Sequence, residues 1–317
     1  MAEIQGLMLR AILDLGSNTF NLLIAKNDKT SSHVENKKIS VKLLKKNTNN
    51  LIDKSAQKRG IDALLKHIKT IKEYNIKEVY AFATSAIRTS SNKQEYINKI
   101  KQKTGLFINV INGKKEAELI AIGVRNNLNI GRNKHLLMDI GGGSTEFIIA
   151  NNKKIYWKSS YDLGVARLLN KFKPNDPISL KEIEKMNSFF ENNLNELINQ
   201  TKINNIVGLI GCSGSFESLA KIIIYKNSKR NSINNFNFDL NKLHELHIKL
   251  LKSNYKQRLK IKGLSSMRAD MIVISSIFII FILKKLKINK LQLSQFALKE
   301  GVLSTLNKKN SWQKSLL

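Results

Sequence analysis

The chain has 317 residues, of which 42% are hydrophobic, so it can bury a sizeable core, and its length favours two domains. Its 54 Lys+Arg residues against 24 Asp+Glu give a formal net charge of +30, which favours anionic partners. The sequence has no arginine-rich tail and no basic run interleaved with aromatic residues, and Lys, Asn and Ile are abundant throughout. We therefore attribute most of the charge to compositional drift, and we expect no dedicated nucleic-acid surface.

A single cysteine, Cys212, excludes an internal disulfide and a cysteine-based zinc site. The first residues carry an acid, and no small-residue cleavage site follows an apolar segment, so we expect no signal peptide. The longest apolar run, residues 271–283, is shorter than the ~20 residues that span a bilayer and contains two serines, which favours a buried helix. We therefore expect a cytoplasmic protein that has no membrane segment.

The first predicted elements are a strand, a glycine turn and a second strand. Apolar "ILDL" and "FNLLIA" flank the turn, which consists of Gly16, Ser17 and Asn18, and the carboxylate of Asp14 stands just before it. A more polar segment follows to about residue 45. Next comes a predicted helix, whose apolar residues recur at spacings that line one face: Ile61, Leu64, Leu65, Ile68 and Ile71.

Strands and helices then alternate, which favours an α/β fold. "EVYAFAT" is a predicted strand that ends at Thr84, and "SAIR" begins a helix or turn. Ser91 and Gln94 form a predicted capping box for a helix that ends at Gly105. "LFINVING" is the next strand, and "KKEAELIAIGV" is a helix with Glu116 in its first turn.

The opening pattern then returns, because "HLLMDIGGGSTEFIIA" at 135–150 again places an Asp and a glycine turn between apolar strands. Asp139 follows Asp14 by 139 − 14 = 125 residues, which is the size of a domain. An internal repeat of a whole supersecondary unit indicates duplication. The sequence therefore predicts two related α/β domains, residues 1–125 and 126–317, that face one another across a cleft.

The second half continues with a strand "IYWKSS", a short helix near 163–172, and a helix to about residue 200 that begins with a capping box of Ser179 and Glu182. "NIVGLIGCSGSFESLA" is a predicted strand, glycine turn and helix. The remainder is predicted to be mostly helical, with a strand "KLQLS" and a last helix after Gly301. We expect the terminal "KKNSWQKSLL" to be frayed.

The glycine turns have a chemical use. Glycine lets the backbone approach a ligand closely and present consecutive N–H groups, which together form a site for an anion such as phosphate. An acid beside the turn would repel phosphate unless Mg²⁺ or another divalent cation lay between them. In the third turn, which contains Gly214 and Ser215, the start of a helix adds a favourable dipole. A plain β-turn is the alternative for any one of these segments.

Four further side chains are candidates for the chemistry. Glu146 begins the strand after the second turn and can face Asp139, so a metal ion is a plausible neighbour, although an exposed strand-edge Glu is the alternative. Glu116 could deprotonate an attacking water, or merely stabilise its helix start. Arg88 and Ser85 could bind phosphate oxygens, although a solvated arginine is the plainer interpretation. His244 and His247 lack the spacing of a metal motif, and Cys212 is interpreted as a small buried residue.

Six segments resemble the exopolyphosphatase and guanosine pentaphosphate phosphohydrolase family, in the same order from residue 9 to about residue 304. They are "AILDLGSNTFNLLIA", "AFATSAIR", "INGKKEAELIAIGV", "LLMDIGGGSTEFIIA", "GCSGSFESLA" and "ALKEGVL". That family belongs to the actin, Hsp70 and sugar-kinase superfamily of duplicated ribonuclease-H-like domains. The resemblance implies two such domains with a cleft between them, in agreement with the internal repeat.

The resemblance also implies hydrolysis of a terminal phosphoanhydride, in inorganic polyphosphate or in guanosine pentaphosphate, with Mg²⁺ or another divalent cation, and a homodimer is compatible with it. By similarity, Glu116 is the acid that activates water, and Asp14, Asp139 and Glu146 are the metal-associated acids. The predicted phosphate-binding residues are Gly16, Ser17, Asn18, Ser85, Arg88, Gly141, Gly142, Gly143, Ser144, Gly214 and Ser215.

The chain departs from the family pattern in three places. Lys115 stands where members often carry a second acid, and "IRTSSN" replaces a more usual acidic or alanine-rich continuation. The chain also ends where longer members add a domain of the HD phosphohydrolase type. Two alternatives stay open: a small-molecule kinase of the same superfamily that uses ATP, and a non-catalytic module that binds polyanions or nucleotides.

Overall fold

The structure is a computed structural model that describes residues 9–26, 33–44, 51–226, 236–306 and 312–316. The chain divides into two compact units. Unit 1 consists of residues 1–123 and 298–317, and unit 2 consists of residues 124–297. The sequence-based division at residue 125 assigned the last twenty residues to the second domain, whereas in the structure these residues return to unit 1.

Unit 1 contains a mixed sheet with the strand order β11-β4-β1-β2-β3, and β5 pairs with β4. Its strands are β1 (Leu9–Leu15), β2 (Thr19–Lys26), β3 (His33–Ser40), β4 (Glu78–Ala83), β5 (Ile108–Val110) and β11 (Ser315–Leu316). β2 is antiparallel to both β1 and β3, whereas β4 is parallel to β1 and to β5. Without β11, this is the five-stranded order of the ribonuclease-H-like fold.

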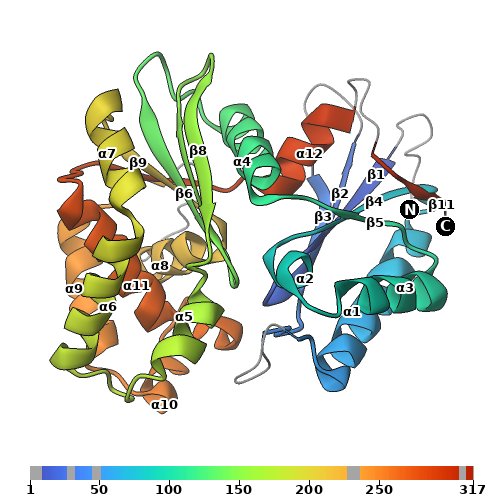
Figure 1. Cartoon of the computed structure of the whole chain (residues 1–317), viewed down its shortest axis with the longest axis horizontal. Helices are drawn as coiled ribbons and strands as arrows, with labels where there is room; N and C mark the ends of the chain where they lie inside the picture. Colours follow the sequence, from blue (N-terminus) through green and yellow to red (C-terminus); the bar gives the residue numbers. More distant parts are fainter. Residues whose placement is uncertain (1–8, 27–32, 45–50, 227–235, 307–311, 317) are drawn as a thin grey trace. The chain divides into compact units, whose positions relative to one another are not determined.

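Helices cover the sheet of unit 1: α1 (Lys54–Glu73), α2 (Ser85–Thr89), α3 (Lys93–Thr104), the first part of α4 (Gly113–Asn127) and α12 (Leu298–Leu306). Asp53 caps α1 by accepting a hydrogen bond from the Ala56 N–H, and Gly105 ends α3 in the left-handed conformation. Figure 1 shows α1 and α3 on one side of this sheet, with α4 and α12 on the other. The candidate residues Asp14 and Ser85 lie near the carboxyl ends of β1 and β4.

Unit 2 repeats the topology. Its sheet has the strand order β10-β9-β6-β7-β8. The strands are β6 (His135–Ile140), β7 (Thr145–Ala150), β8 (Ile155–Tyr161), β9 (Leu209–Cys212) and β10 (Leu291–Ser294). Again the second strand is antiparallel to the first and third, and the last two are parallel to the first. Both units are thus ribonuclease-H-like, so the predicted fold class and its duplication are confirmed. The predicted cleft stays a prediction.

The helical part of unit 2 follows the same logic of apolar faces packed on a sheet. Its helices are α5 (Val165–Phe172), α6 (Leu180–Asn193), α7 (Asn195–Asn204), α8 (Ser213–Lys226), α9 (Leu240–Leu251), α10 (Tyr255–Arg258), the 3₁₀ helix η1 (Ser266–Arg268) and α11 (Ile272–Lys285). The predicted capping box of Ser179 and Glu182 begins α6. α11 is the predicted buried helix, and its Phe278 stacks on Phe190 of α6 with ring centroids 4.4 Å apart. Within the described ranges, no helix has the length and apolar character that crossing a bilayer requires.

Three local expectations were wrong. Leu65 is 45% exposed, because the buried face of α1 passes through Leu64 and Ile68 instead. Asn92, not Ser91, precedes α3, and it forms no capping box. The last helix begins at Leu298 rather than after Gly301. A Cβ on Gly301 would lie 1.8 Å from the Leu119 carbonyl oxygen. The role of this glycine is therefore to let α12 pass close to α4, and it does not mark a helix end.

The end of the chain is also more ordered than expected where the structure describes it. β11 pairs antiparallel with β4, and the Phe107 N–H donates to the Ser315 hydroxyl oxygen at 2.8 Å. The Trp312 ring meets Phe82 edge-on, with centroids 5.1 Å apart. Residues 308–311 and 317 of the predicted frayed segment lie outside the described residues.

Candidate functional site

The first glycine turn joins β1 to β2 and places Asp14 directly opposite Asn21. The Asn21 side-chain amide donates to Asp14 Oδ2 at 2.9 Å. The turn is closed by the Gly16 N–H, which donates to the Thr19 carbonyl at 3.1 Å, and a Cβ on Gly16 would lie 3.0 Å from that oxygen. Ser17 and Asn18 are buried, and their carbonyls accept hydrogen bonds from the backbone of residues 41–43. The turn is therefore held rigidly from both sides.

The second turn joins β6 to β7 in the same way. Asp139 lies directly opposite Glu146, as the sequence predicted, and their side chains are on one face of the hairpin. The Gly141 N–H donates to the Ser144 carbonyl at 3.0 Å, which repeats the bond of the first turn. Glu146 Oε1 accepts hydrogen bonds from the hydroxyls of Ser144 and Ser160, each at 2.7 Å. Asp139 and Glu146 are 6% and 2% exposed, so this hairpin buries two acids.

The carbonyls of the second turn are bound by the start of α5. Gly141 O accepts from the Val165 N–H at 3.0 Å, and Gly142 O accepts from Ala166 and Arg167. Because a peptide group's N–H points opposite to its carbonyl, the N–H groups of residues 142–144 face away from α5, as an anion site requires. Gly164 makes this contact possible, since a Cβ there would lie 2.4 Å from the Gly142 backbone.

The third turn links β9 to α8, with Ser213 in the left-handed region at φ 65°. Gly214 lies under the guanidinium of Arg268, and a Cβ on Gly214 would be 2.1 Å from Arg268 Nη2. The Ser215 hydroxyl is buried and hydrogen-bonds to the Ser275 hydroxyl at 3.0 Å, so this side chain is engaged within the core. Cys212, directly before the turn, is fully buried, as expected.

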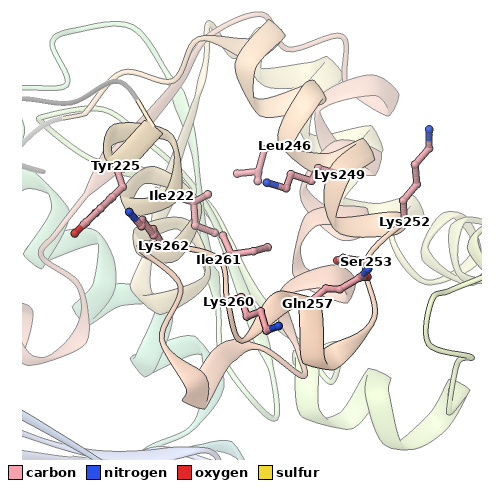
Figure 2. Close-up of a pocket in the computed structure, with 10 residues that line it drawn as sticks. All are labelled: Ile222, Tyr225, Leu246, Lys249, Lys252, Ser253, Gln257, Lys260, Ile261 and Lys262. Carbon is pink, nitrogen blue, oxygen red and sulfur yellow. The ribbon is translucent and has the colours of Figure 1, made fainter.

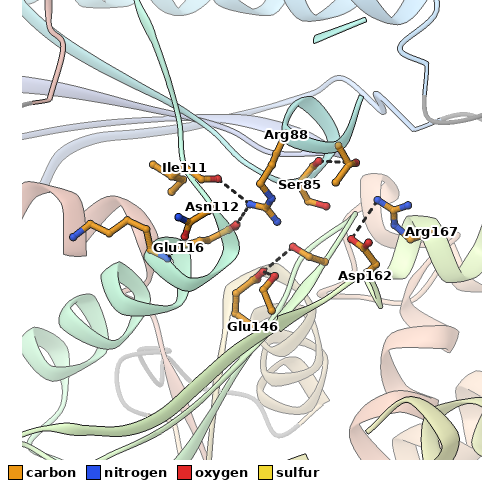
Figure 3. Close-up of polar contacts among 12 residues, drawn as sticks. Ser85, Arg88, Ile111, Asn112, Glu116, Glu146, Asp162 and Arg167 are labelled. Carbon is orange, nitrogen blue, oxygen red and sulfur yellow. Dashed lines mark hydrogen bonds and ion pairs between the residues drawn. The ribbon is translucent and has the colours of Figure 1, made fainter. Parts of the chain in front are cut away.

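Ser85, Arg88 and Glu116 come together in unit 1. The Asn112 side chain caps α4 by accepting from the Lys115 N–H at 2.8 Å, which fixes Glu116 in the first turn. Arg88 Nη1 donates to Glu116 Oε2 at 2.7 Å and to the Ile111 carbonyl at 3.1 Å (Figure 3). The Ser85 hydroxyl is buried and has no hydrogen-bond partner among the described residues. The sequence singled out these side chains separately, and the structure joins two of them in an ion pair.

Burial, together with nearby charges, shifts the pKa of two groups near the turns, Asp14 and Arg268. Burial raises the pKa of Asp14, and nearby Glu300 raises it further, against the lowering effects of Lys299 and the Asn21 hydrogen bond. Burial lowers the pKa of Arg268, while Glu217, Asp139 and Asp270 oppose this effect by favouring the charged guanidinium. Arg268 is therefore a nearby cation that partly compensates the acids of the second turn.

Two acids on one hairpin suit a hard divalent cation. Mg²⁺ is commonly held by one or two carboxylates together with waters and substrate phosphates, and it needs no complete protein cage. Asp139 and Glu146 provide such a pair, whereas Asp14 is opposed by an amide. In the described part of the chain, no group of three or more His, Cys, Asp or Glu side chains forms a ready-made metal cage.

Sequence reasoning missed Asn21, Arg167 and Arg268. Asn21 could have been found by aligning the two hairpins, because it occupies the position of Glu146 in the first repeat. Arg167 donates through Nε to the Gly143 carbonyl at 3.0 Å, and Arg268 packs on Gly214. Neither arginine lies near a turn in sequence, so nothing local in the sequence indicated its position.

The topology and the turns define a protein with duplicated ribonuclease-H-like units, in which an acid of the first strand precedes the glycine turn of each hairpin. The model of the Ppx/GppA phosphatase family matches residues 23–310, and the chain belongs to that family.

Particular relatives agree with this assignment. The chain is 35% identical to an exopolyphosphatase from Cytophaga hutchinsonii whose crystal structure is known, with a TM-score of 0.91 over 94% of this chain and 97% of that one. It is 33% identical to a bifunctional 3-dehydroquinate synthase/phosphatase from Fusobacterium nucleatum, over 84% of this chain and 41% of that protein. It is 27% identical to a guanosine-5'-triphosphate,3'-diphosphate pyrophosphatase from Aliivibrio fischeri, over 92% of this chain and 58% of that protein. The chain thus spans about half the length of these two curated relatives.

Proposed function

We propose that the chain hydrolyses the terminal phosphoanhydride of inorganic polyphosphate, of guanosine pentaphosphate, or of both, by metal-assisted attack of water. The observation that carries the proposal is the 2.7 Å ion pair between Arg88 and Glu116, which holds a buried carboxylate beside a side chain suited to phosphate. Two relatives named as an exopolyphosphatase and as a guanosine-5'-triphosphate,3'-diphosphate pyrophosphatase support this class of reaction.

In this proposal Glu116 is the general base. Its carboxylate accepts a proton from the water that attacks the terminal phosphorus, and Arg88 orients that carboxylate. Arg88 shares only Nη1 between Glu116 and Ile111, so its Nε and Nη2 hydrogens can donate to phosphate oxygens. The orphaned Ser85 hydroxyl is the second proposed donor in unit 1.

The glycine turns are the proposed phosphate-binding elements. The N–H groups of residues 142–144 would donate to phosphate oxygens, where they stabilise the charge that develops as the bond to the leaving phosphate breaks. Ser17 and Asn18 in the first turn, and Gly214 in the third, have the same proposed role. The N–H groups of Gly16 and Gly141 are bonded within their turns, so these two glycines would act by allowing close approach of the phosphate. Ser215 would contribute through its backbone, because its hydroxyl is bonded to Ser275.

Asp139 and Glu146, with Asp14, are the proposed metal-associated acids. A divalent cation, when bound, supplies neutralisation of phosphate-oxygen charge. The buried, opposed pair in unit 2 fits such an ion, because two carboxylates on one hairpin face are costly to ionise together without a cation. Magnesium is our proposed ion, since carboxylate and phosphate oxygens are hard ligands.

The test compares phosphate release from polyphosphate and from guanosine pentaphosphate, with Mg²⁺ and with EDTA. We expect Mg²⁺-dependent release from at least one of the two substrates, and the ratio of the two rates identifies the preferred one. Glu116→Gln should lower turnover about 10²–10⁴-fold. Glu118→Gln is the matched control, because Glu118 lies on the same helix, pairs with Lys115 and is about one-third exposed. Transfer of phosphate to an acceptor without release to water would instead indicate a kinase.

We further propose that the protein acts in the cytoplasm and that it forms a homodimer. A single, buried cysteine suits a reducing compartment. Fractionation of the native host, and light scattering of the purified chain, would test the two statements.

A further inference from the structure

Unit 2 contains a pocket of about 620 Å³ that lies apart from its glycine turns in sequence and takes no part in the proposed reaction. The last turns of α8 and α9, together with α10 and the segment that follows it, form its walls (Figure 2). This volume is within the ~300–1,000 Å³ that small-molecule sites occupy. The pocket can therefore hold a ligand much larger than a single phosphate.

The charge of the pocket is of one sign. Lys249, Lys252, Lys260 and Lys262 line it, and among the described residues no acid does. None of these four ammonium groups forms an ion pair with a carboxylate in the described part of the chain, whereas other lysines, such as Lys242 and Lys285, do. In Figure 2, Lys249 and Lys260 extend into the space between α8, α9 and α10, while Lys252 extends away from it. Like charges around one hollow raise the local potential and attract an anion.

The floor of the pocket is apolar. Ile222 and Leu246 are buried, and Ile261 is half-buried between them and the lysines. Gln257 adds a polar group at the wall: its side-chain oxygen accepts from the Asn254 N–H at 2.9 Å, so its amide hydrogens are the part that can donate to a ligand. Tyr225, at the edge, is 63% exposed and offers a ring face. An inorganic anion alone would leave this apolar surface unused.

We propose that this pocket binds a phosphorylated metabolite of nucleotide size, with its phosphates on Lys249 and Lys260 and its ring or apolar part on Ile222, Leu246 and Ile261. A ligand of this kind satisfies both halves of the lining, because the ammonium groups receive a counter-charge and the aliphatic floor is removed from water. The site is separate from the glycine turns, so it gives the protein a second place at which a phosphate compound is recognised. It does not rest on the hydrolase proposal.

The experiment measures binding of ADP by isothermal titration calorimetry, in EDTA so that metal-dependent binding elsewhere is suppressed. Adenosine and inorganic pyrophosphate are the two half-ligands. We expect ADP to bind at least about tenfold more tightly than either half, since each half makes only one type of contact. Lys249→Gln with Lys260→Gln should weaken ADP binding about tenfold or more, because charged hydrogen bonds are lost.

The matched control is Lys181→Gln with Lys202→Gln, which removes the same charge from exposed positions of unit 2 outside the pocket. We expect this control to bind ADP within about twofold of the wild type. Acetylation of lysines, read by mass spectrometry, should slow at Lys249 and Lys260 when ADP is present and stay unchanged at Lys181.

Four results would overturn the proposal: no ADP binding, equal loss in both double variants, pyrophosphate binding as tightly as ADP, or no protection of the pocket lysines. Lysines that only stabilise the ends of their helices would change thermal unfolding and leave ADP binding unaltered. Phosphate release by the Lys249 and Lys260 double variant is measured in parallel and is expected to stay within about twofold of the wild type. If neither the wild type nor any variant releases phosphate, the proposed function is refuted and the ADP result is unaffected.

Discussion

The Arg88–Glu116 ion pair allows catalysis and stability to be separated. The two charged atoms are 2.7 Å apart, and the side chains are 18% and 9% exposed. Removing one partner of a fully buried ion pair costs about 3–5 kcal/mol. Because both side chains keep some contact with water, we expect Arg88→Met to lower the free energy of unfolding by about 2 kcal/mol. Glu116→Gln keeps an oxygen that accepts from Arg88, so its expected cost is about 1 kcal/mol.

Arg88→Met is expected to lose more stability than Glu116→Gln, whereas Glu116→Gln is expected to lose more turnover. Glu116→Gln removes the proposed base and should lower kcat about 10²–10⁴-fold. Arg88→Met keeps the base but removes phosphate donors, so KM should rise as well as kcat fall. The measurements are urea unfolding followed by circular dichroism, and release of phosphate from tripolyphosphate, with Glu118→Gln as control. Near-normal turnover of Glu116→Gln would refute its role as a base, and an Arg88→Met protein as stable as the wild type would refute the energetic part.

Three further predictions concern the turns and a buried histidine. Gly164→Ala places a methyl group 2.4 Å from the Gly142 backbone and should lower turnover about tenfold or more, whereas Gly208→Ala, with its nearest neighbours at 3.4 Å, should be tolerated; equal activity would contradict this account of the turn. Burial raises the pKa of Asp14, so the protonated carboxyl is favoured in the folded protein; this stabilising contribution is present at pH values below the pKa of the unfolded state and is lost as pH rises through the folded-state pKa. Asp14→Asn should therefore raise Tm at pH 7 without ligand while lowering phosphate release. A lower Tm would count against this explanation. Burial, and then His244, lowers the pKa of His247 to about 4. The contribution of the neutral histidine to the free energy of unfolding is therefore complete above about pH 6.5 and decreases as pH falls towards 4. His247→Asn should reduce the loss of unfolding free energy between pH 7 and pH 5 by about 2 kcal/mol, and an unchanged pH dependence would exclude this histidine as the cause.

Much of the fold could be predicted because its signals are local. Each hairpin has an acid and a glycine between apolar strands, and the second copy of this pattern is enough to indicate duplication from the amino-acid sequence alone. Packing across long sequence separations gave no such signal. The Ser315–Phe107 hydrogen bond joins residues 208 positions apart, and Gly301 is explained only by the Leu119 carbonyl that lies against it. The return of the chain's end to unit 1 was therefore missed.

The candidate site was predicted as a set of residues but not as a set of bonds. Glu116 was identified through the family resemblance and a helix start, and Arg88 through its suitability for phosphate. Their ion pair depends on the Asn112 cap and the Ile111 carbonyl, which position α4 against α2, and no spacing in the sequence encodes that distance. Arg268 was missed for the same reason: it meets Gly214 from a segment more than fifty residues later.

The two hairpins repeat in backbone but differ in charge, and the difference has a chemical consequence. Where unit 2 opposes Asp139 with Glu146, unit 1 opposes Asp14 with Asn21, whose amide hydrogen already neutralises part of the carboxylate. Two opposed acids need a cation, and Arg268 is a protein group that supplies part of that charge. A single acid that is bonded to an amide needs much less compensating positive charge. If the hairpins were interchangeable phosphate turns, no such asymmetry would be required, so we propose that Asp139 and Glu146 have the stronger need for a metal ion. Glu146→Gln should then raise the Mg²⁺ concentration needed for half-maximal phosphate release, whereas Asn21→Ala should not.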